Sequence, residues 1–293
     1  MNRHSQGLVL IALSAVAFSS AGFFTRLIRL DVWTMLFWRG LFAGLMILAV
    51  VVVQERRGGW RSVGRAGRGI GWPGLVAAAC STAATILYIN AFRRTSVADV
   101  AVIFAVAPFV TAALGWLCLG LREAWSTLAA SLLAVLGVGI MVGGAVTDGH
   151  LTGDLLAFGM TVCMAIMMLI IRKYEATPML PAACLSALLC PLLVWPFAAP
   201  FDVGVGDLAQ LVLFGTTQFG LGLLLLTVGG QMVSATENAL LNTLETPLAV
   251  AWVWICFGET PSATTFIGGT IVMAAVGAHV WYSNRARLAE AVA

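Results

Sequence analysis

Charged side chains are scarce in this 293-residue chain, of which only 10% is Asp, Glu, Lys or Arg. Soluble domains carry roughly 25% charged residues, so the composition excludes a soluble fold of this length. The hydrophobic share is 60% and the mean hydropathy is +0.97. These values indicate an integral membrane protein.

Sequence signatures of other chemistries are also missing. The chain has no Walker A sequence, HExxH, CxxC or nucleophile elbow. Its three histidines lie far apart, and its six cysteines all fall inside apolar runs, where they serve as small apolar side chains. The glycines at 64–71 follow no predicted strand and belong to an arginine-rich loop. We therefore expect no enzyme, no cofactor, no metal site and no nucleic-acid partner.

Long apolar runs fill most of the chain. Each of ten runs is long enough, at about 1.5 Å per residue, to cross a hydrocarbon core of roughly 30 Å. The first is a span rather than a cleavable signal because its apolar part is too long. We place the ten spans at 6–28, 32–53, 72–93, 97–120, 125–146, 153–172, 180–199, 208–230, 236–257 and 262–282. The sequence thus predicts an all-α integral membrane fold of ten transmembrane helices.

Basic residues orient these spans. With the N-terminus inside, eleven Lys or Arg residues fall in cytoplasmic segments and four fall outside, while Arg39 lies within a span. Short cytoplasmic loops carry such an excess of Lys and Arg. We expect a multi-pass protein of the bacterial inner (plasma) membrane with both termini in the cytoplasm.

An internal repeat divides the chain. The runs 96–120 and 235–258 each carry a proline at the middle, Pro108 and Pro247, and end in matching Trp, Cys and Gly residues at an offset of 138. The repeat predicts two halves, 1–147 and 148–293, of five spans each. Because five is odd, the second half crosses in the opposite sense, which gives two inverted five-helix repeats around a central cavity. Both prolines are expected to kink their helices.

Polar groups inside hydrocarbon are costly and therefore mark candidate sites. Asn238, Asn242 and Glu245 are spaced to share one face of the ninth span. Glu245 is expected near the middle of the membrane, either lining a cavity where it meets substrate or a proton, or satisfying backbone groups opened by Pro247. Both readings stay open at the level of sequence.

Charged residues near the ends of spans suggest gates. Asp99 is expected at the outer end of the fourth span, with Arg39 in the second span as its partner, and Glu237 occupies the corresponding position at the inner end of the ninth. Ion pairs at opposite mouths would suit gates that open alternately, and static structural pairs explain the same residues equally well.

Aromatic, amide and thioether side chains complete the candidate substrate site. We include four from the first, third, fourth and eighth spans and one from a methionine stripe in the sixth, namely Phe18, Tyr88, Phe104, Gln218 and Met164. The glycine-rich fifth and tenth spans are expected at the periphery. The GxxxG step at Gly139 and Gly143 fits a scaffold or dimer contact, or a lipid-facing helix.

The pattern resembles a known superfamily. Ten spans in two halves, the paired prolines, Arg39 after Phe-Trp, and the endings LCLGLRE (117–123) and ICFGE (255–259) are similar to the drug/metabolite transporter (DMT) superfamily and its EamA-like branch. The first half departs by placing Glu123 three residues after Gly120. Within the branch the chain resembles YddG-type exporters of aromatic and other neutral amino acids. The resemblance implies a central cavity built by spans 1–4 and 6–9, with spans 5 and 10 outside it.

The expected function is secondary transport. We expect export of small amphipathic metabolites, in particular aromatic and other neutral amino acids, by alternating access from a monomer or homodimer in the lipid bilayer. A drug or other metabolite exporter of the same superfamily is the alternative. An exchanger of phosphorylated substrates would need several cavity cations where the sequence offers Arg39, and a membrane-embedded lipid-modifying enzyme would need acidic or histidine clusters at one face.

Overall fold

The computed structural model describes residues 3–56, 71–120, 129–130, 132–140, 150–174, 179–230, 232, 241 and 244–292. These residues are helical apart from turns and short connections, and no strand occurs among them. Six helices are long and apolar enough to cross a membrane, or seven when a bent pair counts as one span. The predicted all-α membrane fold is confirmed, whereas the number of ten spans is not. Of the fifth predicted span only 129–130 and 132–140 lie among the described residues.

Six helices of the first half are described from end to end, besides the helical residues 129–130 and 132–140. They are α1 (Arg3–Ser19), α2 (Ala21–Leu27), α3 (Val32–Arg56), α5 (Gly71–Arg94), α6 (Val97–Ala105) and α7 (Ala107–Leu119). Ser20 separates α1 from α2, and the two together form one apolar stretch of membrane length.

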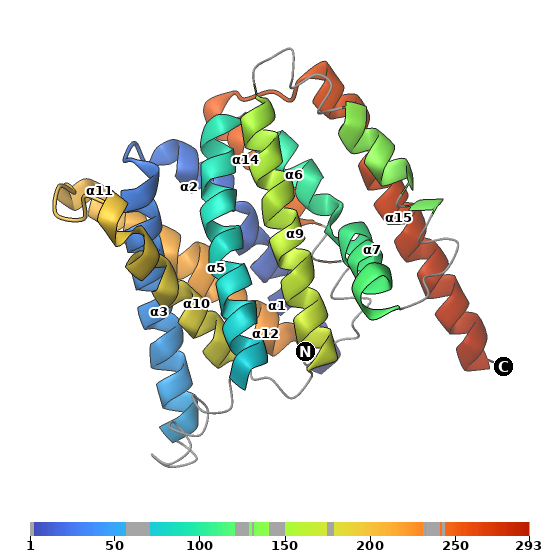
Figure 1. Cartoon of the computed structure of the whole chain (residues 1–293), viewed down its shortest axis with the longest axis horizontal. Coiled ribbons are helices and arrows are strands. Elements are labelled where there is room, and N and C mark those ends of the chain that lie inside the picture. Colours follow the sequence, from blue (N-terminus) through green and yellow to red (C-terminus); the bar gives the residue numbers. More distant parts are fainter. Residues whose placement is uncertain are drawn as a thin grey trace.

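The second half contributes the remaining elements. They are α9 (Leu151–Lys173), α10 (Met179–Val194), η1 (Trp195–Phe197), α11 (Val205–Leu213), η2 (Phe214–Leu221), α12 (Gly222–Gly230), α14 (Glu245–Phe257) and α15 (Ala263–Val292). Helices of the two halves pack in pairs, α5 on α9, α3 on α10 and α1 on α12. Figure 1 shows α5 and α9 side by side within the bundle and α15 at one edge.

The chain bends near one of the two prolines that are expected to kink their helices. The pair α6 and α7 is bent by 45°, and Pro108 is the second residue of α7, where a missing N–H costs no helical hydrogen bond. Pro247 is the third residue of α14, in its first turn. Most of the preceding segment lies outside the described residues, and so does the predicted kink at Pro247.

Apolar side chains cover the outside of the bundle. Large exposed side chains on α7, α14 and α15 include Leu117, Ile255 and Phe266, of which the first two are each 75% exposed. A soluble protein would not display so much apolar surface, but lipid tails solvate it without cost. These faces therefore mark the lipid-exposed perimeter.

In the fifth predicted span the close helix contact occurs at Gly137 and not at Gly139. A Cβ at Gly137 would lie 2.7 Å from the carbonyl oxygen of Gly268 and 2.8 Å from Cγ2 of Val272, so only glycine allows this approach to α15. A Cβ at Gly139 would have no heavy atom within 4 Å. Within the chain the close approach is thus made by Gly137. The scaffold or dimer contact of the Gly139–Gly143 step stays a prediction, since Gly143 lies outside the described residues.

Candidate functional site

A buried arginine occupies the middle of the bundle. Arg39 of α3 is only 3% exposed, and its Nε and Nη2 donate to Oε1 of Gln218 at 3.2 and 2.8 Å. The guanidinium carbon also lies 5.0 Å from the ring centroids of both Phe214 and Phe219. Two aromatic faces and one amide oxygen therefore stabilise the positive charge in place of water.

An unusual helix positions the partners of this arginine. Phe214–Leu221 forms a π-helix between α11 and α12, and Gln218 lies within it. A Cβ at Gly215 would lie 2.8 Å from the carbonyl oxygen of Arg39, so this glycine lets the π-helix press directly on α3. Gln218 uses its other end to donate from Nε2 to the carbonyl of Phe18 at 3.4 Å. Such wide turns are frequent at functional sites.

Tyr88 joins the cluster from α5. Its ring lies 4.4 Å from the ring of Phe92, centroid to centroid, and the charges of both Arg39 and Glu245 reach its hydroxyl. Glu245 begins α14 and is partly buried. A cation, an acid and a phenol from three different helices are therefore electrostatically coupled. We call Arg39, Tyr88, Gln218 and Glu245, with the rings of Phe214 and Phe219, the central cluster.

The other predicted substrate residues have mixed outcomes. The ring of Phe18 lies against α12, 3.1 Å from where a Cβ on Gly222 would be, and its carbonyl belongs to the Gln218 contact. Phe104 and Met164 are partly buried against the main hydrophobic core, and no described contact joins either of them to Arg39. Asn238, Asn242 and Glu237 lie outside the described residues.

The predicted ion pair between Arg39 and Asp99 is wrong. Arg39 bonds Gln218 instead, while Asp99 accepts hydrogen bonds from Thr95 and Ser96 and from the Thr265 hydroxyl. The reason is local. The Ser96 hydroxyl caps α6 by accepting the backbone N–H of Asp99 at 3.0 Å, and it donates to the Asp99 carboxylate at 2.7 Å, which holds Asp99 against the start of α6.

A polar cavity of about 460 Å³ opens at the end of the bundle that carries Asp99. Its lining comes from α2, the α5–α6 turn, His150 and the segment 259–265, and includes Arg26, Arg94, Thr95, Asp99, Glu259 and Thr265. We call this cavity the polar mouth.

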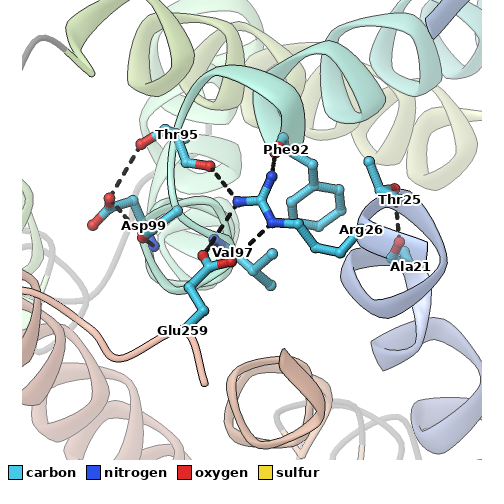
Figure 2. A network of polar contacts seen from close by, with 9 residues as sticks. Ala21, Thr25, Arg26, Phe92, Thr95, Val97, Asp99 and Glu259 are labelled. Atoms are coloured by element: carbon cyan, nitrogen blue, oxygen red, sulfur yellow. Dashed lines mark hydrogen bonds and ion pairs between the residues drawn. The ribbon is translucent and has the colours of Figure 1, made fainter. Parts of the chain in front are cut away.

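An ion pair spans the polar mouth (Figure 2). Arg26 donates from Nε to Oε2 of Glu259 at 2.8 Å and from Nη2 to Oε1 at 3.3 Å. Its remaining donors reach the carbonyls of Phe92 at 2.6 Å and Thr95 at 3.1 Å, and Glu259 Oε1 also accepts the N–H of Val97 at 2.9 Å. The pair therefore ties α2, the α5–α6 turn and the segment after α14 together. We call it the Arg26–Glu259 latch.

Sequence reasoning did not assign the latch to the site, although a signal for it was present. Arg26 ends the first predicted span, and Glu259 directly follows the ninth. Both spans cross the membrane in the same sense, so the basic-residue count places Arg26 and Glu259 at the same, outer face. Arg39 was expected to pair with Asp99, and the pairing of Arg26 with Glu259 was not predicted.

A second acid behind the latch was also missed. Asp154, in the first turn of α9, is 2% exposed, and its Oδ1 contacts the Thr95 hydroxyl at 2.8 Å. A Cβ at Gly153 would lie 2.5 Å from Cβ of Thr95, so the glycine allows α9 to approach the α5–α6 turn this closely. In the described part of the chain no group of three or more His, Cys, Asp or Glu could hold a metal ion.

An apolar-surfaced helical bundle with charged groups buried at its centre and at one mouth has the construction of a membrane transporter. The chain belongs to the EamA-like transporter family, whose family model matches it twice, over residues 5–143 and 151–280. This family is part of the DMT superfamily. One match falls in each of the two predicted halves.

Comparison with solved structures supports the fold. One crystal structure superposes with a TM-score of 0.61 at 16% sequence identity, covering 97% of this chain and 96% of the other. At this identity the likeness concerns the fold alone. No curated protein sequence matches the chain.

Proposed function

We propose that this EamA-family transporter exports small amphipathic metabolites, in particular aromatic and other neutral amino acids, by alternating access. The electrostatic coupling of Arg39 and Glu245 to Tyr88, together with the two aromatic rings beside Arg39, carries the proposal. A neutral amino acid brings one carboxylate, one ammonium and a side chain. The planar guanidinium suits the carboxylate, the acid suits the ammonium, and the rings suit an apolar or aromatic side chain.

The charge of the central cluster favours a singly charged anionic group. Arg39 is its one cation among the described residues, and Gln218 occupies only the Nε and Nη2 donors. Among the described residues no partner takes the remaining N–H groups of the guanidinium, which can donate to a carboxylate. A doubly charged phosphoester would call for additional cations, because an uncompensated negative charge inside a membrane is costly.

We further propose that the polar mouth faces the outside of the bacterial inner membrane, with both termini in the cytoplasm. The supporting argument is the excess of basic residues at the other end of the spans. Export then requires the mouth to widen, and the Arg26–Glu259 latch, which joins three segments across it, is the contact that must open.

Counterflow in proteoliposomes tests the substrate. Vesicles preloaded with unlabelled neutral amino acid should accumulate the labelled compound, while protein-free vesicles should not. Phosphorylated compounds should not substitute for it. Exchange of cationic drugs without exchange of any neutral amino acid would replace the proposed substrate with the drug-exporter alternative.

Glu245→Gln tests the role of the acid. The amide keeps shape and hydrogen-bonding capacity but loses the charge. A charge-assisted hydrogen bond contributes about 1.5–3 kcal/mol, so affinity for the amino acid should fall roughly 10- to 100-fold. Asp202→Asn, at an exposed acid outside the cluster, is the matched control and should leave transport unchanged. Unchanged counterflow in Glu245→Gln would assign Glu245 a purely structural role.

A further inference from the structure

Two buried carboxylates share one hydroxyl group at the polar mouth. The Thr95 hydroxyl lies 2.8 Å from Oδ1 of Asp154 and 3.1 Å from Oδ2 of Asp99. Asp154 is 2% exposed and Asp99 is 6% exposed. Both acids touch the same oxygen atom, so they lie within the range of roughly 4–6 Å over which like charges disfavour joint ionisation.

Counting hydrogens indicates that one is missing. Ser96 and Thr265 each contribute a hydroxyl contact to Asp99, but Thr95 has a single hydrogen for two carboxylate oxygens. If both acids are ionised, the Thr95 hydroxyl can donate to only one of them. The other short contact would then bring two oxygen lone pairs together. A proton on Oδ1 of Asp154 resolves this, because Asp154 then donates to Thr95 and Thr95 donates to Asp99.

The second oxygen of Asp154 supports the same assignment. Oδ2 is buried and accepts no hydrogen bond among the described residues. An unpartnered anionic oxygen inside the bundle would be expensive. In a protonated carboxyl group the same atom is a neutral carbonyl oxygen, for which the missing partner costs much less.

We propose that Asp99 and Asp154 form a proton-binding site, bridged by Thr95, and that the transporter couples substrate movement to the proton held there. Asp99 and Thr95 line the polar mouth, so a proton enters from that cavity onto Asp99. Thr95 then accepts it while passing its own hydrogen to Asp154. No oxidant or co-reactant is needed, since one proton enters and one carboxyl group becomes neutral.

Thr95 also links this site to the latch. Its hydroxyl bridges the two acids, while its backbone carbonyl accepts Nη2 of Arg26 at 3.1 Å (Figure 2 shows Thr95 between Asp99 and Arg26). The protonated pair holds α9 to the α5–α6 turn and leaves the carbonyl placed for Arg26. Loss of the proton puts two negative charges on one hydroxyl, and their repulsion separates α9 from the turn and loosens the latch.

The surrounding charges fit such a switch. His150 precedes α9, Arg93 and Arg94 end α5, and the Arg26–Glu259 latch lines the same mouth. Arg93 donates to the carbonyls of Ile28 and Leu30 at 2.7 and 2.9 Å. Arg26 and Glu259 pair with each other. Among the described residues no cation makes an ion pair with Asp154 or Asp99.

The direction of coupling rests on the proposed export function, whereas the proton site itself does not. After the substrate has left, a proton that binds from the outside closes the outward-facing mouth. Release of this proton to the inside then allows the next substrate to be transported. The protein would then exchange an incoming proton for an outgoing metabolite.

Infrared difference spectroscopy on purified protein in lipid nanodiscs tests the site without any substrate. A pH step should reveal a protonated carboxyl band that disappears in Asp154→Asn and shifts in Thr95→Val. Asn at 154 can donate to Thr95 as the protonated acid does, so this variant should fold. Asp202→Asn should keep the band. A band unaffected by both Asp154→Asn and Asp99→Asn would overturn the proposal.

Transport separates this proposal from the proposed function. In proteoliposomes Asp154→Asn should lose at least about tenfold in accumulation driven by a pH gradient, or about 1.4 kcal/mol, because the amide neither takes up nor releases the proton. Gradient-driven accumulation equal to wild type in this variant would refute proton coupling at this site. Absence of counterflow in the wild type would instead refute the amino-acid substrate and leave the spectroscopic result standing.

Discussion

Removing the partner of the buried arginine should destabilise the fold more than removing both residues. In Gln218→Leu the Arg39 guanidinium would lose the oxygen that accepts both Nε and Nη2. Hydrogen bonds to a charged group contribute about 1.5–3 kcal/mol, and Arg39 is 3% exposed, so water cannot replace the lost partner. The contacts with Phe214 and Phe219 remain. We expect a loss of about 3 kcal/mol in the free energy of unfolding.

The double variant Arg39→Met with Gln218→Leu leaves no unpartnered charge. Its stability should exceed the additive expectation by about 2 kcal/mol, since replacing both partners by apolar groups is close to neutral. The assay is reversible unfolding in mixed micelles of increasing SDS fraction, followed by tryptophan fluorescence. Gln210→Leu is the control, because Oε1 of Gln210 is buried and accepts no hydrogen bond in the described structure, so this variant should be as stable as wild type or more so. Additive single effects, within about 0.5 kcal/mol, would refute the reasoning.

Three further predictions concern packing and the latch. Gly137→Leu should lower stability by about 1–3 kcal/mol through overpacking against α15, whereas Gly139→Leu, with open space around it, should not; equal losses in micelles would contradict this. Gly153→Ala should destabilise by a similar amount, because its Cβ would meet Thr95, and wild-type unfolding would count against it. Glu259→Gln should speed labelling of a cysteine at position 264, in the polar mouth, by an impermeant thiol reagent, and an unchanged rate would remove the latch from the gate.

Features that depend on short segments were predictable from the sequence. Hydropathy located the membrane-length helices, and Pro108 marked the 45° bend between α6 and α7. Both follow from rules that act within one continuous segment of the chain. Gln218 and Glu245 were singled out because a polar group in an apolar span needs a reason, although nothing in the sequence paired Gln218 with Arg39.

Features that depend on competing or distant contacts were not predictable from the sequence. Ser96-x-x-Asp99 is a capping-box sequence, and this local bond pair prevailed over the expected ion pair with Arg39. The π-helix at Phe214–Leu221 has no compositional signature, and Gly215 is its only hint. The Arg26–Glu259 latch joins residues 233 positions apart, so only the predicted sidedness of the spans could have suggested it.

Ligand analogues test most directly whether the central cluster recognises a zwitterion. Binding of an aromatic amino acid to the purified wild-type protein should weaken roughly 10-fold or more when the ligand lacks either its ammonium or its carboxylate group. In Glu245→Gln the penalty for removing the ammonium should largely vanish, while the penalty for removing the carboxylate should persist. Full discrimination against the deaminated analogue in Glu245→Gln would contradict the account, because the acid would then have no part in holding the substrate.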